Sequence, residues 1–182
     1  SLSDQRWFVV RNTVTVFGDM RQKAAIPMLK PILKHPDQRV KRALIRALTM
    51  IGGSEAVPLL LKLVSDPDLT LRRPAILALG ALKREEAIAP LLKIMVRSDI
   101  FGRETDIKLD TIRALAMIGS SVAVAPLLTL AKRKSLLRRN RLEVQRVAAL
   151  SALGQLGDIG IVNSLKRLRN SRQGAISRAA EQ

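Results

Sequence analysis

Residues 37–67, DQRVKRALIRALTMIGGSEAVPLLLKLVSDP, decide the fold of this chain. Their apolar residues return with a period of 3.6, which predicts two amphipathic helices on either side of Gly52 and Gly53. Asp37 stands where a carboxylate can accept the free N–H groups of a first helical turn. Pro58 stands near the start of the second helix, where its missing N–H costs little. Neither helix can bury its apolar stripe alone, so the pair needs neighbours.

The same pattern recurs along the chain and predicts an array of helix pairs. Four prolines mark the second helices: Pro27, Pro58, Pro90 and Pro126. They are 31, 32 and 36 residues apart, and Asn163 takes the equivalent place 37 residues later. The first helices share an Ala-Leu pair, found at 47–48, 78–79, 114–115 and 152–153. Five copies in register indicate a repeat architecture.

The repeating pattern is a hydrophobic residue followed by a basic one, then alternating alanines, then Ala-Leu-Gly and Ala-Val-Pro-x-Leu. This pattern resembles bacterial HEAT-like repeats and covers about residues 4–170. The resemblance implies an all-α fold, a right-handed α-solenoid of about five helix pairs plus a partial sixth. It also implies that first helices lie outside and second helices line the concave side. We expect one domain over 1–182, with repeats at about 4–35, 36–66, 67–103, 104–140, 141–170 and a partial 171–182.

Composition excludes several classes of protein. The chain has no cysteine, which excludes disulfides and thiolate chemistry and fits a reducing compartment. No apolar run approaches the roughly 18 residues of a membrane-spanning helix, and no signal peptide is found, so we expect no membrane insertion and a cytoplasmic location. Ser1 in place of Met and the truncated last repeat suggest a fragment of a larger protein.

The charge balance favours an acidic partner. The chain has 32 basic and 15 acidic residues, a formal net charge of +17. A field of this size attracts polyanions or acidic protein surfaces. The excess is concentrated in residues 132–182, with twelve basic and three acidic residues, and is densest in the segment KRKSLLRRNR at 132–141. Lys and Arg are also good helix formers, so part of the charge is compatible with a solvated helix surface.

Two rows of basic residues follow from the alignment. The first helices repeat one cation after a hydrophobic residue: Arg11, Lys41, Arg72, Lys108 and Arg146. We favour a structural role for this row, covering neighbouring helix ends and turn carbonyls, over a binding role. The second helices place cations three, four and seven residues after the marker position, and positions three and seven share an α-helical face. With Lys132, these are the candidate partner-binding residues: Lys30, Lys34, Lys62, Lys93, Arg97, Lys132, Arg133, Lys166 and Arg167.

Other chemistry-bearing residues have simpler explanations. Trp7, Phe8 and Phe17 gather in the first repeat, where they either cap the stack or mark a face on which preceding sequence docks. The acidic cluster Asp99, Glu104, Asp106 and Asp110 lacks the spacing of a calcium loop, and helix capping explains part of it. His35, the single histidine, lies in a predicted turn.

Three functions remain open, and we favour the first. With one His, no Cys and no Tyr, few groups are available as a base or nucleophile, so we expect no catalysis, no cofactor and no metal. We expect a non-catalytic scaffold for an acidic protein partner. The first alternative is a nucleic-acid-binding module that uses the basic concave surface. The second, from the resemblance, is an enzyme of the DNA glycosylase or bilin lyase type.

Overall fold

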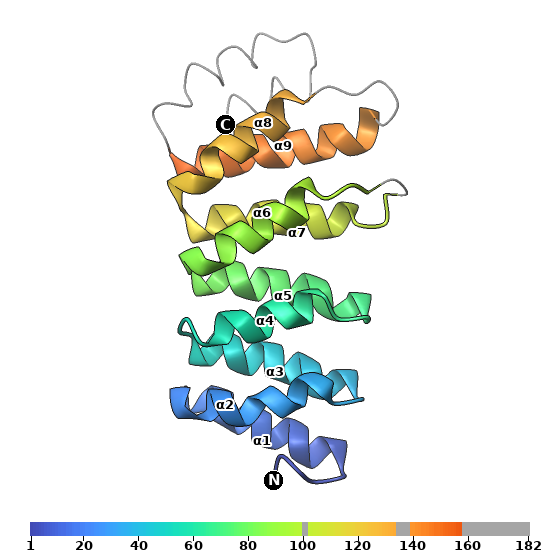
Figure 1. The fold of residues 1–182 in the computed structure, drawn as a ribbon, viewed down its shortest axis with the longest axis vertical. Coiled ribbons are helices and arrows are strands. Elements are labelled where there is room, and N and C mark those ends of the chain that lie inside the picture. Colours follow the sequence, from blue (N-terminus) through green and yellow to red (C-terminus); the bar gives the residue numbers. More distant parts are fainter. Residues whose placement is uncertain (100–101, 134–138, 158–182) are drawn as a thin grey trace. The chain divides into compact units, whose positions relative to one another are not determined.

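The computed structural model describes residues 1–99, 102–133 and 139–157 (Figure 1). Within these ranges the chain forms α-helices, short 3-10 helices and turns, with no β-strand. The all-α prediction is therefore confirmed. The chain divides into two compact units, Ser1–Ala87 and Ile88–Gln182.

The first unit contains two and a half repeats. Its elements are α1 (Trp7–Asp19), η1 (Lys23–Ala25), α2 (Ile26–Leu29), η2 (Lys30–Lys34), α3 (Gln38–Ile51), α4 (Ala56–Val64), α5 (Leu69–Leu82) and η3 (Glu85–Ala87). The first helices stack in order, α1 on α3 and α3 on α5, while α4 packs against α5 and α3 (Figure 1). Val40, Leu44 and Leu48 are fully buried on the stripe that the sequence predicts.

The second unit repeats this arrangement. Its described elements are α6 (Ile88–Val96), α7 (Thr105–Ile118), η4 (Ser121–Ala123), α8 (Val124–Lys132) and α9 (Arg139–Leu156). Helix α7 packs on α6 and α9, and α8 packs on α9. The predicted second helix of the fifth repeat and the partial sixth repeat lie outside the described residues.

Helix ends follow the predicted caps. The Asp37 carboxylate accepts a hydrogen bond from the Arg39 N–H at 2.8 Å, and Asp68 caps α5 by accepting from the Thr70 N–H at 2.9 Å. Gly52 ends α3 with a φ of 71°, a backbone conformation that favours glycine. Asp37 and Gly52 thus mark the two ends of α3, and Asp68 marks the start of α5.

The prolines act differently from the simplest prediction. The sequence predicts one helix over residues 22–34 with a kink at Pro31, but the structure has a 3-10 helix, one α-helical turn and a second 3-10 helix there. Pro31 has no N–H to donate to the Pro27 carbonyl, which accepts instead from Lys30 in the 3-10 pattern. At Pro74 the sequence leaves two possibilities, a helix that begins late, near Arg72 and Arg73, or a helix that bends. Helix α5 begins at Leu69 and has Pro74 inside it, so the late start is wrong.

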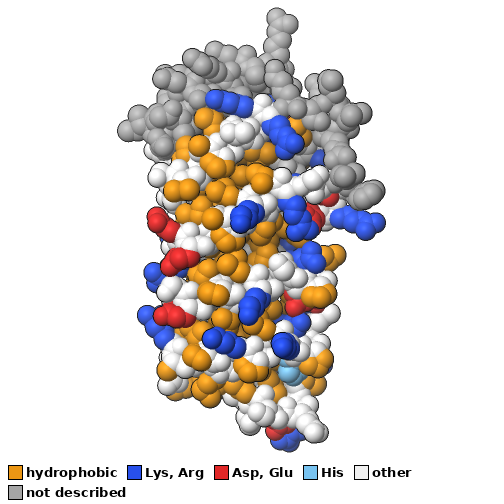
Figure 2. All heavy atoms as spheres, viewed as in Figure 1, with side chains coloured by type: hydrophobic (Ala, Val, Ile, Leu, Met, Phe, Trp, Pro, Cys, Tyr) orange, Lys and Arg blue, Asp and Glu red, His pale blue; other side chains and the backbone are white. Residues whose placement is uncertain are grey.

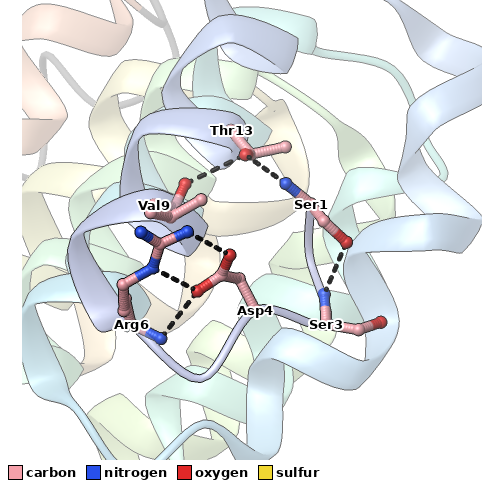
Figure 3. A network of polar contacts seen from close by, with 6 residues as sticks. All are labelled: Ser1, Ser3, Asp4, Arg6, Val9 and Thr13. Carbon is pink, nitrogen blue, oxygen red and sulfur yellow. Dashed lines mark hydrogen bonds and ion pairs between the residues drawn. The ribbon is translucent and has the colours of Figure 1, made fainter.

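A polar turn leads into α1 (Figure 3). The Asp4 carboxylate accepts hydrogen bonds from the Arg6 backbone N–H at 2.9 Å and from its guanidinium at 3.0 Å. The Arg6 side chain lowers the pKa of Asp4 to about 2. One turn into the helix, the Thr13 hydroxyl donates to the Val9 carbonyl at 2.9 Å.

A search of the described residues for membrane-spanning helices finds none with the necessary length and apolar character.

Helices α1 and α3 approach closely at Gly18. A Cβ atom at this position would lie 2.7 Å from the Cα of Ala47. That distance is shorter than real Cβ contacts, and the atom in the way belongs to the backbone of α3. Glycine at this position therefore permits the close stacking of the first two repeats.

We predict that Gly18→Ala destabilises the protein by about 1–3 kcal/mol, because the two helices must separate. Gly154→Ala is the matched control, since Gly154 also lies in a helix and a Cβ atom there would meet no described atom within 4 Å. The control should stabilise the protein by about 0.5–1 kcal/mol through helix propensity. Urea unfolding followed by circular dichroism measures both. Equal stabilisation by the two substitutions would contradict the close-packing explanation.

Candidate binding surfaces

In the first unit, the recurring cations of α3 and α5 meet at one aspartate. Lys41 Nζ lies 2.7 Å from Asp66 Oδ2, and Arg72 Nε donates to the Asp66 backbone carbonyl at 2.7 Å. Asp66 is buried and its side chain also accepts the Asp68 N–H at 2.9 Å. Burial raises the pKa of Asp66, but the bonds from Lys41 and Asp68 outweigh it and hold that pKa below its usual value.

In the second unit, the same cations bind the ends of the preceding second helices. Lys108 Nζ donates to the carbonyl of Arg97, which follows α6, and Arg146 Nε donates to the Ala131 carbonyl in the last turn of α8 at 2.8 Å. The last carbonyls of a helix lack partners within it, and positive charge is favourable there. The structural role predicted for this row is confirmed at Lys41, Arg72, Lys108 and Arg146.

The fifth member of the row stands apart because it lies beside the aromatic cluster. The Arg11 guanidinium donates to the Asn12 side chain at 2.9 Å and lies 5.2 Å from the Trp7 ring centroid. Arg39, from α3, stacks on the same ring at 3.4 Å, a cation–π contact. Phe8 meets Trp7 edge to face and remains 45% exposed. The Trp7 ring therefore joins α1 to α3, while capping of the outer face and docking of preceding sequence both stay predictions.

The candidate cations of the second helices lie on the surface. All seven that the structure describes are exposed: Lys30, Lys34, Lys62, Lys93, Arg97, Lys132 and Arg133. Lys166 and Arg167 lie outside the described residues. On the viewed face of each unit, Lys and Arg side chains are spread among hydrophobic ones, with acidic side chains nearer the margins (Figure 2).

The local geometry of these cations differs between the units. Lys93 and Arg97 are four residues apart at the end of α6, as predicted for one helical face. Lys30 and Lys34 begin and end a 3-10 helix, in which residues four apart point in directions about 120° apart. Arg97 also forms an ion pair with Glu104 at 2.6 Å while its side chain stays 61% exposed.

Acidic and histidine side chains are engaged in local structure. Asp99 accepts the Glu104 N–H at 3.1 Å, and Asp110 pairs with Arg113 at 3.1 Å. Within the described residues, no group of three His, Cys, Asp or Glu could hold a metal ion. The Nδ1 atom of His35 accepts the Asp37 N–H at 3.0 Å, which ties the histidine to the turn before α3.

Comparison with known proteins identifies the family. A family model for HEAT repeats matches residues 1–68 and 26–104, more than half of the chain. The chain belongs to the HEAT-repeat family. A search of curated proteins finds no significant match.

Several solved structures share the fold, and two of them show the extent of the likeness. The complex of CpcE and CpcF of phycocyanin lyase from Nostoc contains a chain that is 21% identical, with a TM-score of 0.62 over 98% of this chain and 71% of that one. An engineered protein is 20% identical, with a TM-score of 0.52 over 99% of this chain and 90% of that one. At these identities the likeness concerns the HEAT-repeat fold alone.

Asp66→Asn should destabilise the HEAT-repeat chain at neutral pH by about 1–3 kcal/mol, because it removes the charge that Lys41 and Arg72 approach. The pKa of folded Asp66 is depressed, so its stabilising effect is present above the unfolded pKa and is lost as pH falls through the folded one. The difference between wild type and variant should therefore shrink below pH about 4. Urea unfolding across this pH range measures it.

Asp37→Asn is the matched control for this pair. Asp37 caps α3 and binds Arg39, whose side chain is 56% exposed, and asparagine caps helices about as well as aspartate. The control should lose little stability at neutral pH. A loss of stability as large as that of Asp66→Asn would show that burial of the Lys41–Asp66 pair does not cause the destabilisation.

Proposed function

We propose that this HEAT-repeat chain is a non-catalytic scaffold that binds an acidic segment of a partner protein through the exposed cations of its second helices. The observation that carries the proposal is the contrast between its two basic rows. Lys41, Lys108 and Arg146 are bound to helix ends and turns of the fold, while the second-helix cations extend into solvent. Exposed cations are available to carboxylates of another chain.

The distribution of surface charge suits an extended acidic ligand. On the face shown in Figure 2, apolar side chains lie between many of the Lys and Arg side chains of each unit. Separated charges match side chains spaced along a polypeptide, and the apolar patches between them add contact area. The HEAT-repeat chain from Nostoc is described in complex with a second protein, which also favours a protein partner.

A non-catalytic role is consistent with the side chains at hand. The chain has one histidine and neither cysteine nor tyrosine. His35 accepts a backbone hydrogen bond through Nδ1, and Asp66 is bound to Lys41. These contacts serve the fold, and they leave the cationic surface as the feature best suited to binding.

The same likeness favours a second candidate, a lyase subunit of the phycocyanin type. Coexpression of the chain with a bilin and an apo-phycocyanin subunit tests it, with absorbance of the purified subunit as the readout. Covalent attachment that depends on the chain would contradict the non-catalytic proposal.

The main test is binding of a short fluorescent peptide rich in Glu and Asp, followed by anisotropy. Reversing three cations of the second unit, Lys93→Glu, Arg97→Glu and Arg133→Glu, should weaken binding at least about tenfold, because attraction is lost and repulsion replaces it. The control reverses Arg46, Lys83 and Arg84, which are exposed but lie outside the second helices, and changes the net charge equally. It should weaken binding much less.

Two outcomes would overturn the proposal. Equal weakening by both triple variants would show that only net charge matters. Tighter binding of a labelled DNA duplex of similar net charge, lost in the Lys93, Arg97 and Arg133 variant, would favour the nucleic-acid alternative, whose affinity falls steeply with salt.

A further inference from the structure

The second unit contains a cleft of about 360 Å³ that the repeat pattern does not predict. It lies where the end of α6, the start of α7, the residue after α8 and the start of α9 converge. Its volume is in the range of clefts that hold small ligands. Residues from four separate elements therefore line one concave site.

The charge lining this cleft is strongly positive. Four cations line it, Arg97, Lys108, Arg133 and Arg141, against a single carboxylate, Asp99. Part of the positive charge is already balanced nearby, because Arg97 pairs with Glu104 at 2.6 Å. Arg133 and Arg141 are exposed at the cleft, and no ion pair of either with a carboxylate is found in the described part of the chain.

Lys108 is the most buried of these cations, with 7% of its surface exposed. Its ammonium is held in place by the Arg97 carbonyl. Burial lowers its pKa, the carboxylates of Asp99 and Glu104 oppose this, and Arg133 and Arg97 lower it further. The two arginines therefore lie close enough to Lys108 for their positive fields to add.

Gly102 helps to place the fourth cation. The guanidinium of Arg141 occupies the space where a side chain at position 102 would begin, and Gly102 has a φ of 72°. Both the backbone conformation and the available space suit glycine. The turn before α7 thus leaves room for Arg141 to lie beside the cleft.

We infer that this cleft binds a phosphate group, as a phosphate monoester or as free phosphate. The guanidinium groups of Arg133 and Arg141 offer paired N–H donors that match phosphate oxygens, and Arg97, which also binds Glu104, and Lys108 add positive charge. A dianion gains more from such a cluster than a single carboxylate does. Gln145, which also lines the cleft, adds an uncharged side-chain donor.

The phosphate site extends the proposed function and rests on it in part, because Arg97 and Arg133 belong to both. A phosphorylated residue within an acidic segment would occupy the cleft while neighbouring carboxylates meet Lys93 and the other exposed cations. Because the charge lining the cleft remains positive with Asp99 and Glu104 included, a phosphate dianion gains more there than an unphosphorylated acidic side chain does.

Isothermal titration calorimetry with inorganic phosphate and with O-phosphoserine tests the site, using chloride at matched ionic strength as the reference. The Arg133→Gln, Arg141→Gln double variant should weaken binding of both probes about tenfold or more. The control double variant, Arg46→Gln and Arg84→Gln, removes the same charge at exposed positions outside both the cleft lining and the second helices and should change affinity less than about threefold. Tighter binding of O-phosphoserine than of phosphate indicates a monoester, and equal or weaker binding indicates free phosphate.

The inference is overturned if neither probe binds better than chloride, or if the two double variants weaken binding equally. The fluorescent acidic peptide separates this failure from that of the proposed function. Peptide binding without phosphate binding would leave the scaffold function intact and remove the phosphate site. Loss of both would remove both.

Discussion

Burial of paired helices against their neighbours is the constraint on which this structure depends. Each first helix has one apolar stripe, and in α3 its members Val40, Leu44 and Leu48 are fully buried. Such a helix cannot stand alone in water, because the stripe of one repeat is covered by the next. At Gly18, α1 touches the backbone of α3, which leaves no room for a side chain between these two helices.

Stacking also decides which basic side chains bind groups within the fold and which remain exposed to solvent. When repeats pack side by side, the end of a second helix, with its unpaired carbonyls, lies beside the next first helix. Arg72, Lys108 and Arg146 bind such carbonyls, and Lys41 binds the carboxylate of Asp66. When a Lys or Arg side chain donates to a backbone carbonyl, its charge stays close to the backbone and its methylene groups cover apolar surface. The second-helix cations that the structure describes are instead exposed to solvent.

Much of this organisation can be predicted from the sequence because it is local. The period of the apolar residues, the Asp37 cap and the Gly52 helix end depend on neighbours within a few residues, and the structure confirms them. The structural role of the first-helix cations is also predictable, since the repeat places each beside the same kind of helix end. Pro31 shows the limit, because propensity alone does not tell a kinked α-helix from the 3-10 helices that form there.

The cleft of the second unit lies beyond sequence reasoning for a different reason. Arg97 and Arg141 belong to different repeats, and the longer turn around Gly102 as well as helices α7 and α8 lie between them in the chain. Their convergence depends on how that turn folds, and no periodic pattern encodes it. The expansion of this repeat is the signal that the sequence does offer, since extra residues between repeats often carry binding.

The central claim is that stacking of the repeats leaves some lysines bound within the fold and others free to bind a partner. Labelling of the lysine amines tests this claim most directly. Brief acetylation of the native protein, read by mass spectrometry at each lysine, compares Lys41 and Lys108 with Lys62 and Lys93. We predict that Lys41 and Lys108 react slowly, because both are held in bonds to the fold, while Lys62 and Lys93 react quickly. Similar rates at all four lysines would contradict the claim.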